Sequence, residues 1–135
     1  MSEDYFLAHC ISADFGMHAG IVVEFNKRFD MKNRITKENP GYLEKCEKEN
    51  MLGDCIQIDR VMNLITKPYC SGYPTYESVA EALNKMGKIC YEKGIQKVAM
   101  PAIGYGIDKL EWDRVSELIQ NVLKHTPIDI IVCLR

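Results

Sequence analysis

Most strands of this chain are marked by continuous apolar runs and not by alternation of apolar and polar residues. A run of this kind is typical of a strand that is buried on both faces of a sheet. Four runs are expected to form central strands: Phe6–Ile11, Val61–Thr66, Val98–Met100 and Ile128–Leu134. A fifth run, Cys55–Ile58, is separated from Val61 only by Asp59 and Arg60, which predicts a hairpin.

Apolar residues at helical spacing lie between the first strand and the hairpin. An apolar aromatic or aliphatic residue recurs every fourth position from Ile21 to Phe29, so this segment is expected to be a helix. Residues 30–40 are polar and lead into an NPG turn signal. Tyr42–Lys48 is expected to form a short, partly exposed helix.

Two further helices follow the hairpin. Thr75 is expected to cap a long helix that ends at Gly94. Asp108 and Glu111 have the spacing of a capping box, which predicts that the last helix opens there. Strands that alternate with helices predict an α/β fold, with one domain over residues 1–135 and a mixed, mostly parallel central sheet between helices.

Composition and charge exclude several classes of protein. The chain is 47% hydrophobic and 27% charged, as in an ordinary globular protein. Its formal net charge of -2 gives no general affinity for nucleic acid or for an anionic membrane. No apolar run approaches the length of a membrane span, and the start, MSEDYFLAHC, has no basic region before a hydrophobic core. We therefore expect neither a membrane helix nor a signal peptide.

The six cysteines are not spaced as metal or redox ligands. None belongs to a CxxC pair, and three lie inside apolar, strand-like runs: Cys10, Cys55 and Cys133. A thiol in such a run behaves as a small hydrophobic side chain. We expect reduced cysteines, an intracellular protein and no metal.

Three polar loops follow strand ends, which is where ligands bind in sheets of this kind. They are Ser12–Gly20, Lys67–Pro74 and Ala102–Asp108. The first and third contain glycines and run directly into predicted helices, so backbone N–H groups and a helix dipole can meet adjacent phosphates. Neither matches GxxxxGK[ST] or GxGxxG. The loops therefore predict a nucleotide diphosphate that is bound without a dinucleotide fold.

Five segments, in order along the chain, resemble a known family: LAHCIS, GMHAGIVVEF, NLITK, PTYESV and MPAIGYGIDKLEW. The chain is similar to macrodomains, and among them to the branch of terminal ADP-ribose protein glycohydrolase, from Leu7 almost to the C-terminus. The resemblance implies a three-layer α/β/α fold, ADP-ribose as the ligand and no cofactor. The diphosphate and the distal ribose would lie between the two glycine loops.

The resemblance also implies the roles of individual residues. Lys67 would attack the anomeric carbon of the distal ribose, and Asp108 would transfer protons and release the lysine adduct. The residues expected to contact the ligand are Ser12, Gly16, Met17, His18, Ala19, Gly20, Ile103, Gly104, Tyr105, Gly106 and Ile107.

Each candidate also has an ordinary structural role. A lysine after a strand is most often solvated, so Lys67 is weak evidence by its position alone. Asp108 can cap the last helix, with Glu111 reciprocating, and Ser12 can satisfy a strand end. His9 lies inside an apolar strand and is expected to be a hydrogen-bonded core histidine.

The chain departs from the family pattern at its start. Macrodomains usually begin with a further strand and a Gly-Asp pair whose aspartate contacts the adenine amino group. The start MSEDYFLAHC leaves no room for that strand before Phe6, and Asp4 is too close to LAHC to be equated with that aspartate. We therefore expect a sheet that lacks the usual first strand, which either exposes an edge or calls for a partner to cover it.

The leading function that the resemblance implies is hydrolysis of mono-ADP-ribose from glutamate or aspartate esters of proteins. Deacetylation of O-acetyl-ADP-ribose and removal of ADP-ribose from a nucleic-acid base are close variants. A non-catalytic reader of ADP-ribose and a truncated structural relative are the other classes. Lys67 and Asp108 favour the enzyme, because a reader needs neither. The expected partner is ADP-ribose or a mono-ADP-ribosylated protein, with nucleic acid only as a modified substrate and no membrane.

Overall fold

The computed structural model describes residues 5–16, 27–28, 30–69, 73–101, 110–124 and 126–133. A five-stranded sheet with the order β2-β3-β1-β4-β5 forms its centre. The strands are β1 (Phe6–Ser12), β2 (Asp54–Ile58), β3 (Val61–Lys67), β4 (Lys97–Pro101) and β5 (Asp129–Cys133). Only β2 is antiparallel to its neighbour among these strands, which confirms the mixed, mostly parallel sheet and the hairpin.

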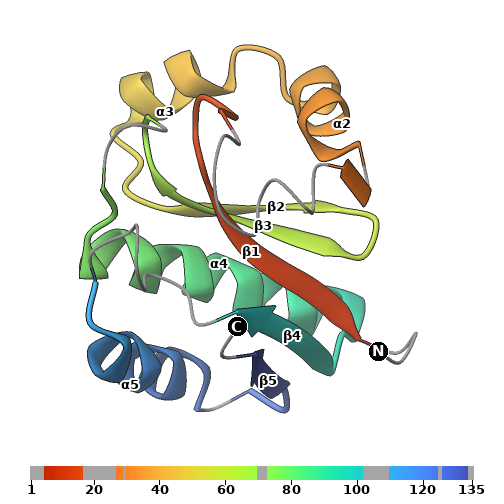
Figure 1. The fold of residues 1–135 in the computed structure, drawn as a ribbon, viewed down its shortest axis with the longest axis vertical. Helices are drawn as coiled ribbons and strands as arrows, with labels where there is room; N and C mark the ends of the chain where they lie inside the picture. The colour runs from red at the N-terminus through yellow and green to blue at the C-terminus, as the bar shows by residue number, and fades with distance from the viewer. Residues whose placement is uncertain are drawn as a thin grey trace.

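Helices cover both faces of the sheet (Figure 1). The described helices are α2 (Met31–Glu38), α3 (Tyr42–Glu49), α4 (Tyr76–Lys93) and α5 (Trp112–Leu123). The first two pack on one face and the last two on the other, which confirms the three-layer α/β/α arrangement. No helix of the described residues is long and apolar enough to cross a membrane.

The inner strand β3 shows why the strand sequences are continuously apolar. Successive side chains of a strand point to opposite faces. Val61 and Ile65 pack in the core under α2 and α3, whereas Met62 and Leu64 pack in the core under α4 and α5. All four are at most 3% exposed. Because helices cover both faces, the inner strands leave few positions for a solvated polar side chain.

One polar pair joins β1 to β3 on the face of the sheet that α2 and α3 cover. His9 on β1 is paired in register with Asn63 on β3, and both are fully buried. The Asn63 amide donates to the Ile56 carbonyl at 3.0 Å, so its oxygen is left to accept a hydrogen bond from His9 Nε2. Burial lowers the pKa of His9 to about 4, against the smaller opposing effect of this hydrogen bond. His9 is thus the hydrogen-bonded core histidine that the sequence predicts.

The sequence places both ends of α4 correctly. Thr75 is the N-cap residue, and its hydroxyl accepts from the Ser78 N–H while the Ser78 hydroxyl accepts from the Thr75 N–H, each at 3.0 Å. Gly94 closes the helix with a φ of 69°, a left-handed conformation that a side chain disfavours.

The prediction for the last strand is wrong in one respect. The segment is a strand, but β5 stands at the end of the strand order, and its Ile131 is 44% exposed. Ile130 and Val132 are half-buried against the α4–α5 core. An apolar run over Ile128–Leu134 indicates a strand, but its place at the edge depends on tertiary packing.

Two helix predictions also need correction. No helix is predicted in the polar segment 30–40, yet residues 31–38 form α2, which buries Met31 and Ile35. The last helix begins at Trp112, and Glu111 is its N-cap residue, without a side-chain cap hydrogen bond. A capping box from Asp108 would require Glu111 to lie within the helix, so that prediction is wrong. The predicted helix over 21–29 lies largely outside the described residues.

Gly53 is expected to be the most sensitive glycine of the described fold. A β-carbon there would lie 2.1 Å from the backbone oxygen of Ser78 and 3.0 Å from the Ala82 nitrogen. We predict that Gly53→Ala lowers the free energy of unfolding by about 1–3 kcal/mol, because backbone cannot move aside as a side chain can. Gly87→Ala is the matched control, since its β-carbon would meet only the Leu123 side chain. Urea unfolding that finds Gly53→Ala as stable as Gly87→Ala would contradict this packing.

His9 should make stability depend on pH. The folded protein keeps His9 neutral down to about pH 4, whereas the unfolded chain binds a proton below about 6.5. The contribution of neutral His9 to the free energy of unfolding is therefore fully present above pH 6.5. It falls as the pH drops toward 4, by about 3 kcal/mol at most. His9→Gln removes the titrating group and should flatten this part of the profile. Urea unfolding at several pH values measures both proteins, and parallel profiles would refute the assignment.

Candidate functional site

The carboxyl ends of β1 and β3 lie side by side. Ser12, the last residue of β1, is paired with Lys67, the last residue of β3, after a register shift that skips Thr66. Backbone pairing continues past both strands, with the Ala13 N–H donating to the Lys67 carbonyl at 2.9 Å and the Asp14 N–H donating to the Pro68 carbonyl at 3.1 Å. Two predicted site residues, Ser12 and Lys67, are thus held together by the main chain.

Asp14 organises the turn after β1. The Ser12 hydroxyl and the Gly16 N–H both donate to Oδ1 of Asp14, the latter at 3.1 Å. An ionised carboxylate only accepts hydrogen bonds, so the Ser12 hydroxyl hydrogen points to Asp14. Any ligand group that reaches the Ser12 oxygen must therefore donate a hydrogen bond to it. This supports the structural role considered for Ser12 and defines what contact it can still make.

Phe15 in the same turn has a strained backbone that α3 helps to hold. Its φ of 56° lies in the left-handed region, which is rare for a bulky residue. Its ring stacks on that of Tyr42 with centroids 5.4 Å apart. The Tyr42 hydroxyl donates to Asp54 on β2, and burial, followed by this carboxylate, raises the pKa of Tyr42 well above its usual range. A neutral phenol thus links the turn to α3 and β2.

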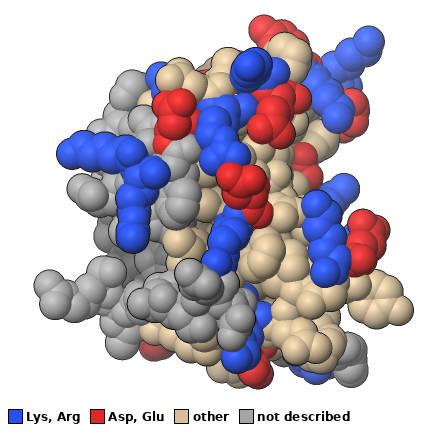
Figure 2. Space-filling view, turned by 90° about the vertical axis from the view of Figure 1, so that its right-hand side faces the viewer, with Lys and Arg blue, Asp and Glu red and all other residues tan. Residues whose placement is uncertain are grey.

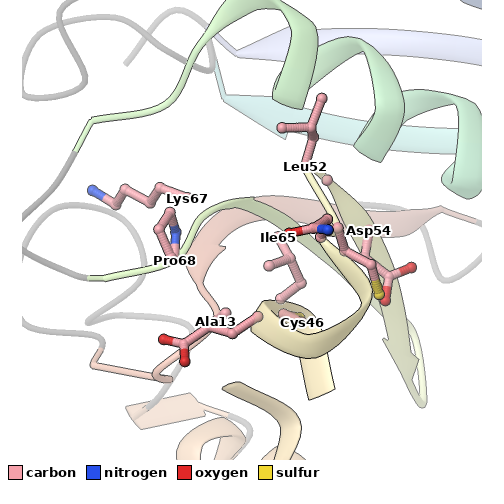
Figure 3. A pocket seen from close by; sticks show the side chains of 11 residues that line it. Ala13, Cys46, Leu52, Asp54, Ile65, Lys67 and Pro68 are labelled. Carbon is pink, nitrogen blue, oxygen red and sulfur yellow. The ribbon is translucent and has the colours of Figure 1, made fainter. Parts of the chain in front are cut away.

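A cavity of about 250 Å³ opens beside the end of β3. It lies between α3, residues 50–54 and the ends of β1 and β3 (Figure 3). Lys67 and Pro68 form one wall, and Ile65 lies at the base among the labelled side chains. The Lys67 side chain extends away from Ile65 and from the rest of the labelled cavity residues in Figure 3. Lys67 therefore lines the cavity while its amine is directed away from the other labelled residues.

The chain after Lys67 is tied to α3. The hydroxyl of Tyr69 donates to Oε1 of Glu47, a residue that also lines the cavity. This hydrogen bond is the main reason that the pKa of Tyr69 is raised, although the side chain is 47% exposed. The contact fixes the segment that carries Lys67 against the helix at the rim of the cavity.

A second link joins the starts of α4 and α5. The Glu111 N–H donates to the Tyr76 hydroxyl at 3.0 Å, and the Arg114 guanidinium stacks 4.2 Å from the centroid of the Tyr76 ring. A cation over an aromatic face is attracted to it. The chain that re-enters the described fold at Leu110 is therefore fixed to the N-terminal end of α4.

Several predicted site residues lie outside the described residues, so their positions stay predictions. They are Met17, His18, Ala19, Gly20, Ile103, Gly104, Tyr105, Gly106, Ile107 and Asp108. Ser12, Gly16 and Lys67 lie within the described part and meet at one edge of the sheet. Asp14 is not among the predicted site residues, although an aspartate two residues before a glycine is a common turn signal.

The cysteines and the charges add no metal ligand set to the described part. It contains no group of three or more His, Cys, Asp or Glu side chains that could hold a metal. Cys10, Cys46, Cys55 and Cys90 are not in disulfide bonds, and burial raises the pKa of Cys90 to about 11. On the side of the β2–β3 turn, lysines and arginines lie among aspartates and glutamates (Figure 2). Asp59 of this turn forms an ion pair with Arg34 of α2.

Comparison with known proteins identifies the fold. No family model matches the chain. The macrodomain of Mycobacterium tuberculosis DarG has a TM-score of 0.76 at 20% identity, with 93% of this chain and 86% of that chain covered. The macrodomain of Thermus aquaticus DarG has a TM-score of 0.75 at 22% identity, with 96% and 88% covered. The three-layer fold is therefore that of a macrodomain.

Sequence identity places the chain more narrowly. ADP-ribose glycohydrolase OARD1 of Homo sapiens is 37% identical over 130 residues, which cover 93% of this chain and 79% of that protein. The Bos taurus protein of the same name is 36% identical over the same length. The chain belongs to the macrodomain family, in the branch of ADP-ribose glycohydrolase OARD1.

The turn after β1 gives a prediction that is independent of any ligand. Asp14→Ala removes the acceptor of Ser12 and Gly16 and should cost about 1 kcal/mol of stability. The Gly16 amide should then exchange its hydrogen faster. Asp14→Asn keeps an oxygen acceptor and should stay close to the wild type. Hydrogen-exchange mass spectrometry or NMR measures the Gly16 amide, and equal protection in Asp14→Ala would show that Asp14 does not hold this turn.

Proposed function

We propose that the protein is an ADP-ribosyl glycohydrolase that removes mono-ADP-ribose from ester-linked glutamate and aspartate side chains of proteins. One observation carries the proposal. The chain is 37% identical, over 130 aligned residues that cover most of both chains, to a protein named ADP-ribose glycohydrolase. ADP-ribose is then the bound group, and the modified protein is the substrate.

The architecture supports a ligand at the edge where Ser12 and Lys67 meet. In open α/β sheets, ligands bind outside the carboxyl ends of the parallel strands. β1 has β3 on one side and β4 on the other, so the chain leaving β4 starts from the same edge. The glycine loops after β1 and β4 would supply backbone N–H groups for the diphosphate.

Lys67 is the proposed nucleophile. Its neutral amine attacks the anomeric carbon of the distal ribose, and the bond from that carbon to the ester oxygen breaks. The acidic side chain leaves as a carboxylate, a stable anion that needs no proton. Water then attacks the anomeric carbon of the lysine adduct and releases ADP-ribose, which restores the amine.

Asp108 is the proposed acid and base of this sequence. The attacking amine must lose a proton once the carbon–nitrogen bond has formed, and the water must lose one in the second step. A carboxylate can accept each proton and return one to the departing lysine nitrogen. The Ser12 hydroxyl donates its hydrogen bond to Asp14. The Ser12 oxygen would therefore accept a hydrogen bond from a ribose hydroxyl.

The test uses an ester-linked mono-ADP-ribosylated protein and measures the free ADP-ribose that is released. We predict that Lys67→Ala keeps ADP-ribose binding in calorimetry but loses turnover by roughly a thousandfold or more, as in other losses of a nucleophile. Lys67→Arg should fail as well, because a guanidinium stays protonated. Asp108→Ala should also lose turnover.

Two outcomes would overturn parts of this proposal. Undiminished hydrolysis by folded Lys67→Ala would end the lysine mechanism. Tight binding of ADP-ribose by a wild-type protein that releases none would identify a reader in place of a hydrolase. Intact-mass spectrometry of Asp108→Ala after exposure to substrate gives a further check, since a gain of one ADP-ribose at Lys67 would capture the adduct directly.

A further inference from the structure

The cavity beside Lys67 has no role in the chemistry proposed above. Its volume is about 250 Å³, and eleven residues from α3, residues 50–54 and the ends of β1 and β3 line it. The Lys67 amine extends away from it (Figure 3), so the sugar that this amine would attack lies elsewhere. A space of this size next to a reacting group calls for an occupant of its own.

The lining combines apolar and acidic residues. Ile65 and Ala13 are buried, and Met51 and Pro68 add apolar surface. Leu52 is 52% exposed and adds apolar surface that an incoming group can reach. This surface suits the methylene groups of a long side chain.

Two carboxylates belong to the same lining, Glu47 of α3 and Asp54 of β2. Each accepts a hydrogen bond from a tyrosine, Glu47 from Tyr69 and Asp54 from Tyr42. An ionised carboxylate has about four acceptor sites, so a single hydrogen bond leaves capacity for more. Glu47 is solvent-exposed at the rim, where an incoming group can reach it.

The charge of the lining selects the occupant. Lys67 is the one cationic side chain among the eleven residues, and its amine points out of the cavity. Glu47 is the exposed acidic side chain of the lining, so it disfavours an anion such as the phosphates of a nucleic acid and attracts a cation. A side chain with an apolar stem and a positive end complements both parts of the lining.

We propose that this cavity is a subsite for a lysine or arginine that flanks the ADP-ribosylated residue of a protein substrate. The stem packs on Ile65, Leu52 and Pro68, and the charged end reaches Glu47. The proposal rests on the proposed function and narrows its substrate class to acidic residues in a basic context. It also favours a protein over a nucleic acid as the modified molecule.

The experiment compares three synthetic peptides, each with one ester-linked ADP-ribosylated glutamate. The two neighbouring positions carry lysine in the first, norleucine in the second and glutamate in the third. With the wild-type protein, kcat/KM should be roughly three- to tenfold higher for the lysine peptide than for the norleucine peptide, mainly through KM. The glutamate peptide should be the poorest substrate.

Variants assign the preference to the cavity. Glu47→Gln keeps an acceptor for Tyr69 and removes the charge, so it should abolish the advantage of lysine over norleucine. Glu44→Gln is the matched control, since Glu44 is an exposed acid of the same helix and does not belong to the cavity lining. Leu52→Ala should raise KM for the lysine and norleucine peptides alike. High salt should reduce the lysine advantage.

The outcomes separate this proposal from the proposed function. Hydrolysis of all three peptides at equal kcat/KM, or a lysine preference that persists in Glu47→Gln, would overturn the subsite and leave the hydrolase intact. If no peptide is hydrolysed, the hydrolase is refuted, and calorimetry with the same peptides still tests the subsite. Equal or undetectable affinity for the lysine and glutamate peptides would then overturn it.

Discussion

The pairing of β1 with β3 beyond the ends of both strands is the constraint on which the candidate site depends. Hydrogen bonds from Ala13 and Asp14 to the carbonyls of Lys67 and Pro68 extend the parallel ladder into the loops. These contacts are made by the backbone, so they fix the main-chain positions of Ser12 and Lys67 and do not involve their side chains. A site on such extensions is more rigid than one on free loops, and rigidity favours defined catalytic geometry.

The buried pair of His9 and Asn63 supports the same ladder from within the core. A slip of one residue between β1 and β3 would place His9 and Asn63 on opposite faces of the sheet and leave their hydrogen bond unmade. An unpaired buried amide or imidazole costs more than a made hydrogen bond gains. The pair therefore specifies the register that brings Ser12 beside Lys67, at the cost of a stability that declines in mild acid.

The sequence predicts elements well where the signal is local. Phe6–Ile11 and Val61–Thr66 are recognisable because inner strands are apolar at nearly every position, and α4 is framed by Thr75 and Gly94. α2 is not predicted because only Met31 and Ile35 of its eight residues are buried, so the sequence has no pronounced apolar periodicity there. The edge position of β5 has no local signal, since it is set by which strands pair.

The candidate site also has a part that the sequence predicts and a part that it does not. Ser12 and Lys67 could be brought together from strand ends alone, because carboxyl ends of parallel strands share one edge of the sheet. The cavity could not be foreseen, since its walls come from α3, residues 50–54 and β3, and depend on how the helix packs. Gly53 illustrates this, because its small size matters only through the backbone of α4 that lies against it.

The contacts of Tyr76 bear on how this protein can be altered. β4 lies between two parallel strands, and Glu111 and Arg114 contact Tyr76, so the described residues on either side of 102–109 are fixed by contacts within the described fold. Closing a longer segment between fixed stems has a small entropic cost, since each doubling of length costs only about 0.6 kcal/mol of free energy. That interval is therefore a natural place for grafting foreign sequences and for selecting new ligand specificities from libraries, with the remaining sheet and helices kept as the scaffold.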